Sequence, residues 1–199
     1  MEYYMHGLLM TQFLWHHHYS ILKLFRSSIP KYNSTTNAYL EIGGGHGLYL
    51  AEAIRMLPDC KNFDMVDISK SSLEMAKQFV NNNKVAFTLQ DIYKYEKEGY
   101  YDFVTMGEVL EHVEQPLQLM QRINKLLKPK GHAFITTPAN APAIDHIALF
   151  TSREDIVKIF NEANFEVVED ISLYTEDVSK EKAEELKIPM MYGALIKKV

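Results

Sequence analysis

The chain has 199 residues, of which 47% are hydrophobic and 24% are charged, and its formal net charge is −5. A single domain of this length can bury a full core. Its Lys and Arg residues form no extended basic cluster, which disfavours a large nucleic-acid partner. No apolar run is long enough to span a bilayer, and the lone Cys60 cannot form an internal disulfide. We therefore expect a cytoplasmic protein that is either a monomer or a homodimer.

Residues 2–27 carry apolar side chains at mixed three- and four-residue spacing, which predicts one or two helices ahead of the main fold. Within this segment the three consecutive histidines 16–18 would fan over about 200° of a helix, so they cannot all face one site. We expect them to be exposed or half-exposed, with the alternative that one of them faces a ligand. We assign residues 1–37 to an N-terminal helical segment and residues 38–199 to the main domain.

A glycine-rich stretch follows the first predicted strand, residues 39–42. Four glycines stand within residues 43–47, and a helix is predicted over residues 48–57. This pattern is typical of a strand that enters a sharp turn whose backbone comes close to a ligand. A dinucleotide-binding turn would need a third glycine where Leu48 stands, so a dehydrogenase is disfavoured.

The rest of the chain alternates short apolar runs with helical patterns. Strands are predicted over residues 62–68, 85–91, 101–106, 132–137, 165–171 and 191–197, and helices over 69–80, 116–127, 152–163 and 179–187. This alternation predicts an α/β fold with a doubly wound, mostly parallel seven-stranded sheet, whose last strand is antiparallel.

Acidic residues close two of these strands, Asp67 after the second and Asp91 after the third. In an open α/β sheet, ligands bind at the carboxyl ends of the strands, near the switch in strand order. An acid at the position of Asp67 can accept hydrogen bonds from both hydroxyls of a ribose. The sequence therefore places a nucleoside-like ligand at this edge of the sheet.

The acid and glycines Glu41, Gly43, Gly45 and Gly47 form the pattern E-x-G-x-G-x-G. This pattern resembles motif I of the class I methyltransferases that depend on S-adenosylmethionine (SAM), and the resemblance extends over roughly residues 38–170. It implies SAM as the cofactor, with Glu41 at its amino-acid end and the glycine turn beneath it. The further cofactor contacts that the resemblance implies come from Asp67, Ile68, Asp91, Ile92 and Met106.

A second cluster of polar residues follows the fourth strand. Glu108, Glu111 and His112 stand at i, i+3 and i+4, which places them on one face if the segment is a helical turn. With residues 136–140 and His146, the segment resembles a subgroup that contains the ubiquinone-pathway polyprenyl catechol O-methyltransferases and the small-RNA 2′-O-methyltransferases. In that subgroup E-x-x-E-H supplies metal ligands, and His146 corresponds to a further ligand of the RNA enzymes.

The resemblance therefore implies a divalent metal held by Glu108, Glu111, His112 and His146. Two carboxylates and two imidazoles suit Mg²⁺, Mn²⁺, Fe²⁺, Co²⁺ or Zn²⁺. The alternative is a site without metal, in which a histidine acts as a base or only caps the segment. In either case His112, His146 and Glu108 are the candidate catalytic residues.

We expect a methyltransferase acting on a small molecule, on a hydroxyl oxygen, with the N-terminal segment as a lid. The alternatives are an N-methyltransferase, a nucleotide or RNA-end methyltransferase and, less favoured, a non-catalytic SAM-binding regulator. The lid would cover the substrate with a set of aromatic and histidine side chains. That set comprises Tyr3, Tyr4, His6, Phe13, Trp15 and His16.

Overall fold

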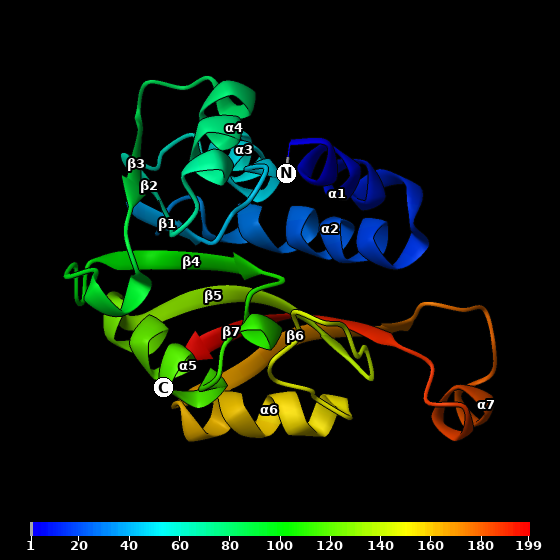
Figure 1. Ribbon diagram of the computed structural model, residues 1–199. Coiled ribbons are helices and arrows are strands. Elements are labelled where there is room, and N and C mark those ends of the chain that lie inside the picture. Colours follow the sequence, from blue (N-terminus) through cyan, green and yellow to red (C-terminus); the bar gives the residue numbers. More distant parts are fainter. Residues whose placement is uncertain (1) are drawn as a thin grey trace.

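The computed structural model describes residues 2–199; the side chains of residues 1–6 and 8 lie outside this description. Two helices, α1 (Glu2–Leu14) and α2 (His16–Ser28), precede the sheet and lie side by side (Figure 1). A short 3₁₀ turn, η1 (Ile29–Tyr32), then leads into the first strand. The prediction of one or two helices over this segment is confirmed. Within residues 2–199, no helix has the length and apolarity that crossing a membrane requires.

Seven strands form one sheet in the order β3-β2-β1-β4-β5-β7-β6, with β7 antiparallel to both of its neighbours. The strands are β1 (Ala38–Ile42), β2 (Asn62–Asp67), β3 (Val85–Leu89), β4 (Tyr101–Gly107), β5 (Leu127–Ala139), β6 (Phe165–Tyr174) and β7 (Met190–Lys198). The predicted doubly wound, mostly parallel sheet is confirmed. Every residue of β1 is buried, because this central strand is covered on both faces.

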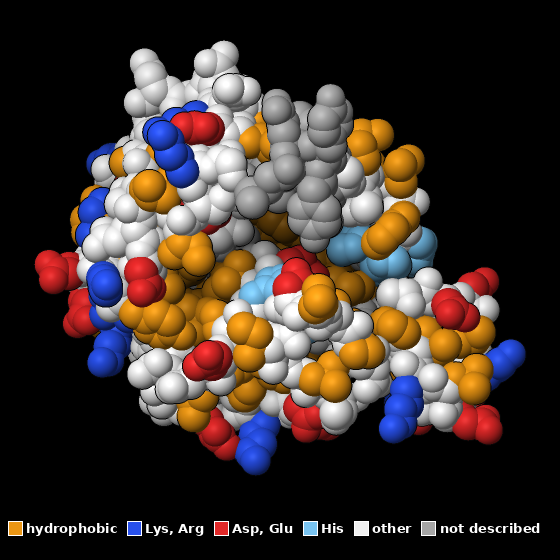
Figure 2. Space-filling view, in the orientation of Figure 1, with side chains coloured by type: hydrophobic (Ala, Val, Ile, Leu, Met, Phe, Trp, Pro, Cys, Tyr) orange, Lys and Arg blue, Asp and Glu red, His pale blue; other side chains and the backbone are white. Residues whose placement is uncertain are grey.

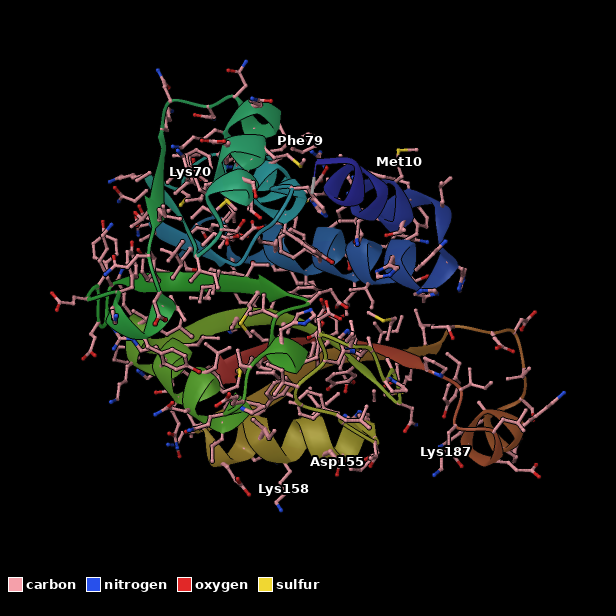
Figure 3. All side chains as sticks on the ribbon, in the orientation of Figure 1. Met10, Lys70, Phe79, Asp155, Lys158 and Lys187 are labelled. Atoms are coloured by element: carbon pink, nitrogen blue, oxygen red, sulfur yellow. The ribbon has the colours of Figure 1, made fainter. Side chains whose placement is uncertain are left out.

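Helices cover both faces of the sheet (Figure 1). One apolar core is shared by α2, α3 (Leu48–Met56) and α4 (Lys70–Val80), and the other by α5 (Pro116–Leu126) and α6 (Arg153–Glu162). The short helix α7 (Lys180–Glu185) precedes β7. On α6 the apolar face is buried, whereas Lys158 points away from the sheet into solvent (Figure 3).

The helix α2 is part of the core that it covers. Leu22 and Phe25 are fully buried, and α2 contacts both β6 and β7. Gly193 of β7 makes this close approach possible, because a Cβ there would lie 2.8 Å from Cγ2 of Ile21. The N-terminal segment therefore contains one helix that packs on the sheet, α2, and one that packs against α2, α1.

Strand β5 begins earlier than the sequence predicts, at Leu127 in place of His132. Leu127 pairs with Tyr101 at the start of β4, and the register then shifts before Phe103. Lys130, with a φ of 64°, lies within this irregular part. Residues 128–131 are thus an irregular stretch of strand and not a separate connection, because pairing with β4 continues on both sides of them.

Candidate active site

A cavity of about 390 Å³ opens where β1 and β4 end at the carboxyl edge of the sheet. Its lining comes from the glycine turn, the segment after β4, the loop after β5 and the corner between α1 and α2. Figure 2 shows a hollow in this face of the molecule, with histidine side chains on two sides of it. Parallel strands β1 and β4 are neighbours, so their ends bring these distant segments together.

The glycine turn forms one side of the cavity. Gly43 donates its N–H to the carbonyl of Val66 over 2.9 Å and has a φ of 62°, which an L side chain rarely adopts. A Cβ on Gly43 would lie 2.6 Å from Cγ2 of Val109, and one on Gly44 would collide with the carboxylate of Glu41. Both added Cβ atoms would meet the protein itself, so only glycine fits this backbone, and residues 43–45 line the cavity.

Glu41 lies beneath this turn and lines the cavity. Its side chain is almost fully buried, and its Oε2 has no hydrogen-bond partner among the described residues. Burial raises the pKa of this carboxyl well above its usual range. A buried oxygen without a partner is costly unless a ligand satisfies it. The glycine turn and this oxygen together fit the amino-acid end of SAM, and we call residues 41–46 the donor wall.

The acid Asp67 ends β2 next to the donor wall. Its carboxylate is largely buried and accepts the N–H of Ser69 over 2.7 Å, while its carbonyl accepts the N–H of Gln90. Burial raises the pKa of Asp67. Ile68 is 78% exposed, so its side chain is free to cover a ligand held by Asp67. The ribose role of this pair stays a prediction.

Asp91 and Ile92 begin the 3₁₀ turn η2 (Ile92–Lys94) after β3. Asp91 caps the turn by accepting the N–H of Tyr93 over 3.0 Å, and Ile92 is largely buried. Met106 is fully buried within β4, and the cavity is lined by its neighbour Gly107. Met106 thus lies in the core and not in the lining of the cavity, and its cofactor contact, like the adenine contacts of Asp91 and Ile92, remains a prediction.

The segment after β4 forms a helical turn over only part of the predicted motif. It is a single 3₁₀ turn, η3 (Leu110–His112), and Glu108 precedes it with a left-handed φ of 54°. Glu108 accepts a hydrogen bond from Thr136 over 2.6 Å, and Glu111 accepts one from Thr137 over 2.9 Å. Burial, and for Glu108 the neighbouring charge of Glu111, raise the pKa of both carboxyls.

Three of the predicted metal ligands come together. Glu111, His112 and His146 each offer a ligand atom, and these atoms lie within 4.8 Å of one another. The two imidazole rings are 5.0 Å apart between centroids. Glu108 lies outside this group, so the geometry gives a three-residue candidate metal centre where the sequence predicts four ligands. We call Glu108, this group and Asp145 the acceptor wall, since all of them line the cavity.

Backbone carbonyls orient the two histidines of this wall. Nδ1 of His112 lies 2.7 Å from the carbonyl of Asp145, and Nδ1 of His146 lies 2.6 Å from the carbonyl of Ala141. Because a carbonyl only accepts, each Nδ1 carries the proton and each Nε2 keeps its lone pair in the neutral ring. This arrangement is the one that metal-binding histidines usually show. The donor set therefore fits a divalent cation, with two imidazoles, a carboxylate and no sulfur.

The lid residues lie only partly where the sequence predicts. Trp15 lines the cavity, but His16 is exposed and lines a second, outer cavity, while Phe13 is exposed. His17, which the sequence predicts to be exposed or half-exposed, is buried and lines the first cavity together with His18. His17 is buried because the core residues of α2 fix the rotation of this helix about its axis. The side chains of residues 3, 4 and 6 lie outside the described part of the chain.

Sequence reasoning missed several further residues of the cavity, among them Gln12, His46 and Tyr49. His46 stands inside the glycine motif, and its Nδ1 accepts the N–H of Leu48 over 3.2 Å. Burial lowers the pKa of His46 to about 4 and raises that of Tyr49 above its usual range. The position of His46 between two glycines was an available signal, whereas Gln12 had none.

Comparison with known proteins identifies the class. A family model described as a methyltransferase domain matches residues 14–170. The chain therefore belongs to the methyltransferase-domain family, and the resemblance to class I SAM-dependent methyltransferases is confirmed. The solved structure of the N-methyltransferase NodS from Bradyrhizobium japonicum, in complex with S-adenosylhomocysteine, has the same fold. It superposes with a TM-score of 0.67 at 18% identity, over 89% of this chain and 87% of that one.

Curated relatives are more similar in sequence. The ubiquinone biosynthesis O-methyltransferase of Vibrio parahaemolyticus is 32% identical over 128 residues, which cover 62% of this chain and 52% of that protein. The enzyme of that name from Rickettsia bellii is 34% identical over 100 residues, which cover 49% of this chain and 40% of that protein. The chain thus spans about half the length of the curated relatives it matches.

Proposed function

We propose that the chain transfers the methyl group of SAM to a hydroxyl oxygen of a small molecule, assisted by a divalent cation. One observation carries the proposal: a single cavity joins the donor wall to the candidate metal centre of Glu111, His112 and His146. The O-methyltransferase names of the curated relatives support oxygen as the acceptor atom.

The reaction depends on the placement of the acceptor oxygen more than on covalent catalysis by the protein. The acceptor oxygen must lie in line with the carbon–sulfur bond, which breaks as the carbon–oxygen bond forms, and the hydroxyl proton must pass to a base. The sulfonium of SAM supplies an activated methyl group. In the donor wall, the backbone of residues 43–45 and the oxygen of Glu41 would hold the cofactor's amino-acid end, with Asp67 on its ribose.

The acceptor wall supplies the remaining groups. A divalent cation held there would lower the pKa of the acceptor hydroxyl. Glu111, His112 and His146 would hold this cation. Glu108 lies outside the three-residue group but lines the same cavity, and it would receive the hydroxyl proton. Thr136 holds the carboxylate of Glu108 in place through its hydrogen bond.

We also propose that the lid function belongs to α1 and its corner with α2 and not to all of residues 1–37. The apolar face of α2 is core, whereas α1 packs mainly on α2. Residues 38–199 with α2 would then form the catalytic domain.

Turnover of labelled SAM on a panel of catechols and other hydroxylated metabolites tests this function. We expect methylation of a hydroxylated compound by the wild type, its loss in His146→Ala and its retention in His16→Ala, a control on the exposed histidine. SAM binding without transfer to oxygen on any compound of the panel, or transfer to nitrogen only, would contradict the proposal.

A further inference from the structure

Three aromatic rings at the corner of α1 and α2 form a cluster over the cavity. The centroid of Trp15 lies 5.5 Å from the rings of both His17 and His18, and these two rings are 4.7 Å apart. All three residues line the cavity, together with Gln12 of α1. The cluster therefore offers ring surface for a planar ligand, on a segment distinct from both walls.

A hydrogen bond orients one ring of this cluster. The side-chain Nε2 of Gln12, which is buried, lies 3.4 Å from Nδ1 of His18. An amide nitrogen only donates, so Nδ1 accepts and the ring proton lies on Nε2. Burial lowers the pKa of His18 to about 4, so the ring is neutral at pH 7. His18 is left with one N–H donor to offer a ligand in the cavity.

The charge of the cavity restricts that ligand. Four acids line it, Glu41, Glu108, Glu111 and Asp145, and no Lys or Arg among the described residues does. The seven residues whose side chains are not described include no Lys or Arg either. A carboxylate or phosphate that the acceptor placed at the ring cluster, away from the glycine turn and the candidate metal centre, would find no cationic side chain to compensate its desolvation. An uncharged acceptor avoids this cost.

We propose that Gln12, Trp15, His17 and His18 form a recognition subsite, the lid subsite, for an uncharged planar acceptor that carries a carbonyl-type oxygen. The rings pack on the plane of the acceptor, and Nε2–H of His18 donates to that oxygen. This inference rests on the proposed methyl transfer, since it concerns the second ligand of the same cavity. It disfavours nucleotides and RNA ends that would place a phosphate at the ring cluster.

Three catechols of similar size test the lid subsite: protocatechualdehyde, protocatechuate and methylcatechol. They carry a carbonyl, a carboxylate and a methyl group at the same ring position. We expect the aldehyde to exceed methylcatechol in kcat/KM by about fivefold to tenfold, the effect of one neutral hydrogen bond. The carboxylate should fall below the aldehyde by at least about tenfold. Calorimetry with S-adenosylhomocysteine bound should give the same order of affinities.

Matched variants separate recognition from folding. His18→Phe keeps a ring and removes the donor, so the ratio of kcat/KM for the aldehyde to kcat/KM for methylcatechol should fall about fivefold to tenfold. Discrimination against the carboxylate should persist, because it comes from the lack of Lys and Arg among the described residues that line the cavity and not from His18. Gln12→Leu should reduce the aldehyde preference in part. His16→Phe, on the exposed neighbour, should leave all three substrates unchanged.

Measuring catechol binding as well as turnover distinguishes a failure of the lid subsite from a failure of the proposed methyl transfer. If no catechol is methylated but the aldehyde binds in a manner that depends on His18, the lid subsite stands and O-methyl transfer is wrong. If methylcatechol is methylated and His18→Phe leaves the aldehyde preference intact, the lid subsite is wrong. Tighter binding of protocatechuate than of the aldehyde would also overturn it.

Discussion

The donor wall offers mainly backbone to the cavity, whereas the acceptor wall offers ionisable side chains. The donor wall is one continuous stretch, residues 41–46, in which the missing Cβ atoms of Gly43 and Gly44 let the turn pack closely against Val109 and Glu41. The acceptor wall combines the segment after β4 with the loop after β5, and its carboxylates depend on hydrogen bonds from Thr136 and Thr137. Substitutions in the donor wall should therefore weaken cofactor binding, and substitutions in the acceptor wall should lower methyl transfer while the cofactor still binds.

The largest effect is expected from Gly43→Ala in the donor wall. A left-handed backbone with a Cβ costs about 1–2 kcal/mol, and the forced contact with Val109 adds about 1–3 kcal/mol. The turn can relieve these costs only by leaving its position at the cavity, so S-adenosylhomocysteine affinity should fall at least about 30-fold, as measured by calorimetry. Gly99→Ala is the matched control, because Gly99 has a similar φ of 60° but no atom within 4 Å of the added Cβ. Equal loss of affinity in both variants would contradict the role of close approach.

Asp67→Ala should have the next largest effect. If its carboxylate accepts the ribose hydroxyls, each charge-assisted bond that is lost contributes about 1.5–3 kcal/mol. The affinity for S-adenosylhomocysteine should then fall about 10-fold to 100-fold. The control is Asp177→Ala, which removes an exposed acid after β6. Unchanged affinity in Asp67→Ala would show that the ribose assignment is wrong.

The free energy of unfolding should also depend on pH through His46 of the donor wall. Its imidazole stays neutral in the folded protein down to about pH 4, whereas an unfolded histidine takes up a proton near pH 6.5. Lowering the pH through this window therefore stabilises the unfolded state, and at pH 5 the loss is about 2 kcal/mol. Urea unfolding at pH 7 and pH 5 should show that His46→Asn loses less stability on acidification than the wild type. An identical loss would contradict the assignment.

The smallest effect is expected from Thr137→Val in the acceptor wall. This change of similar shape removes the hydrogen bond to Glu111 and should lower turnover about fivefold, while affinity for S-adenosylhomocysteine stays unchanged. Thr105→Val is the control, because the buried Thr105 hydroxyl has no hydrogen-bond partner among the described residues. Weaker cofactor binding in Thr137→Val would show that the two walls are not separable.

The two walls also differ in how far sequence could predict them. The glycine turn is local, so its spacing and the strand before it were sufficient to place it. The left-handed conformation of Glu108 was not predictable, because E-x-x-E-H is compatible with an α-helical turn, and the structure therefore brings three of the four expected ligands together. The position of His146 near His112 was anticipated from a resemblance and not from spacing.

The lid is a second region that the sequence predicts only in part. Three consecutive histidines are equivalent in sequence, and only the packing of Leu22 and Phe25 on the sheet decides that His17 and His18 face the cavity while His16 faces outward. The alternation of strands and helices, in contrast, predicts the sheet and its antiparallel last strand. The orientation of these histidines depends on contacts between segments that are distant in sequence, so the local pattern could not predict it.

The most direct test of the account is wild-type turnover in excess chelator, measured together with affinity for S-adenosylhomocysteine. The account predicts that the chelator abolishes methyl transfer to a hydroxylated acceptor, that Mn²⁺, Co²⁺ or a similar ion restores it, and that cofactor affinity does not change. Full activity in excess chelator would contradict the metal-assisted mechanism and leave Glu108, His112 or His146 as a plain general base.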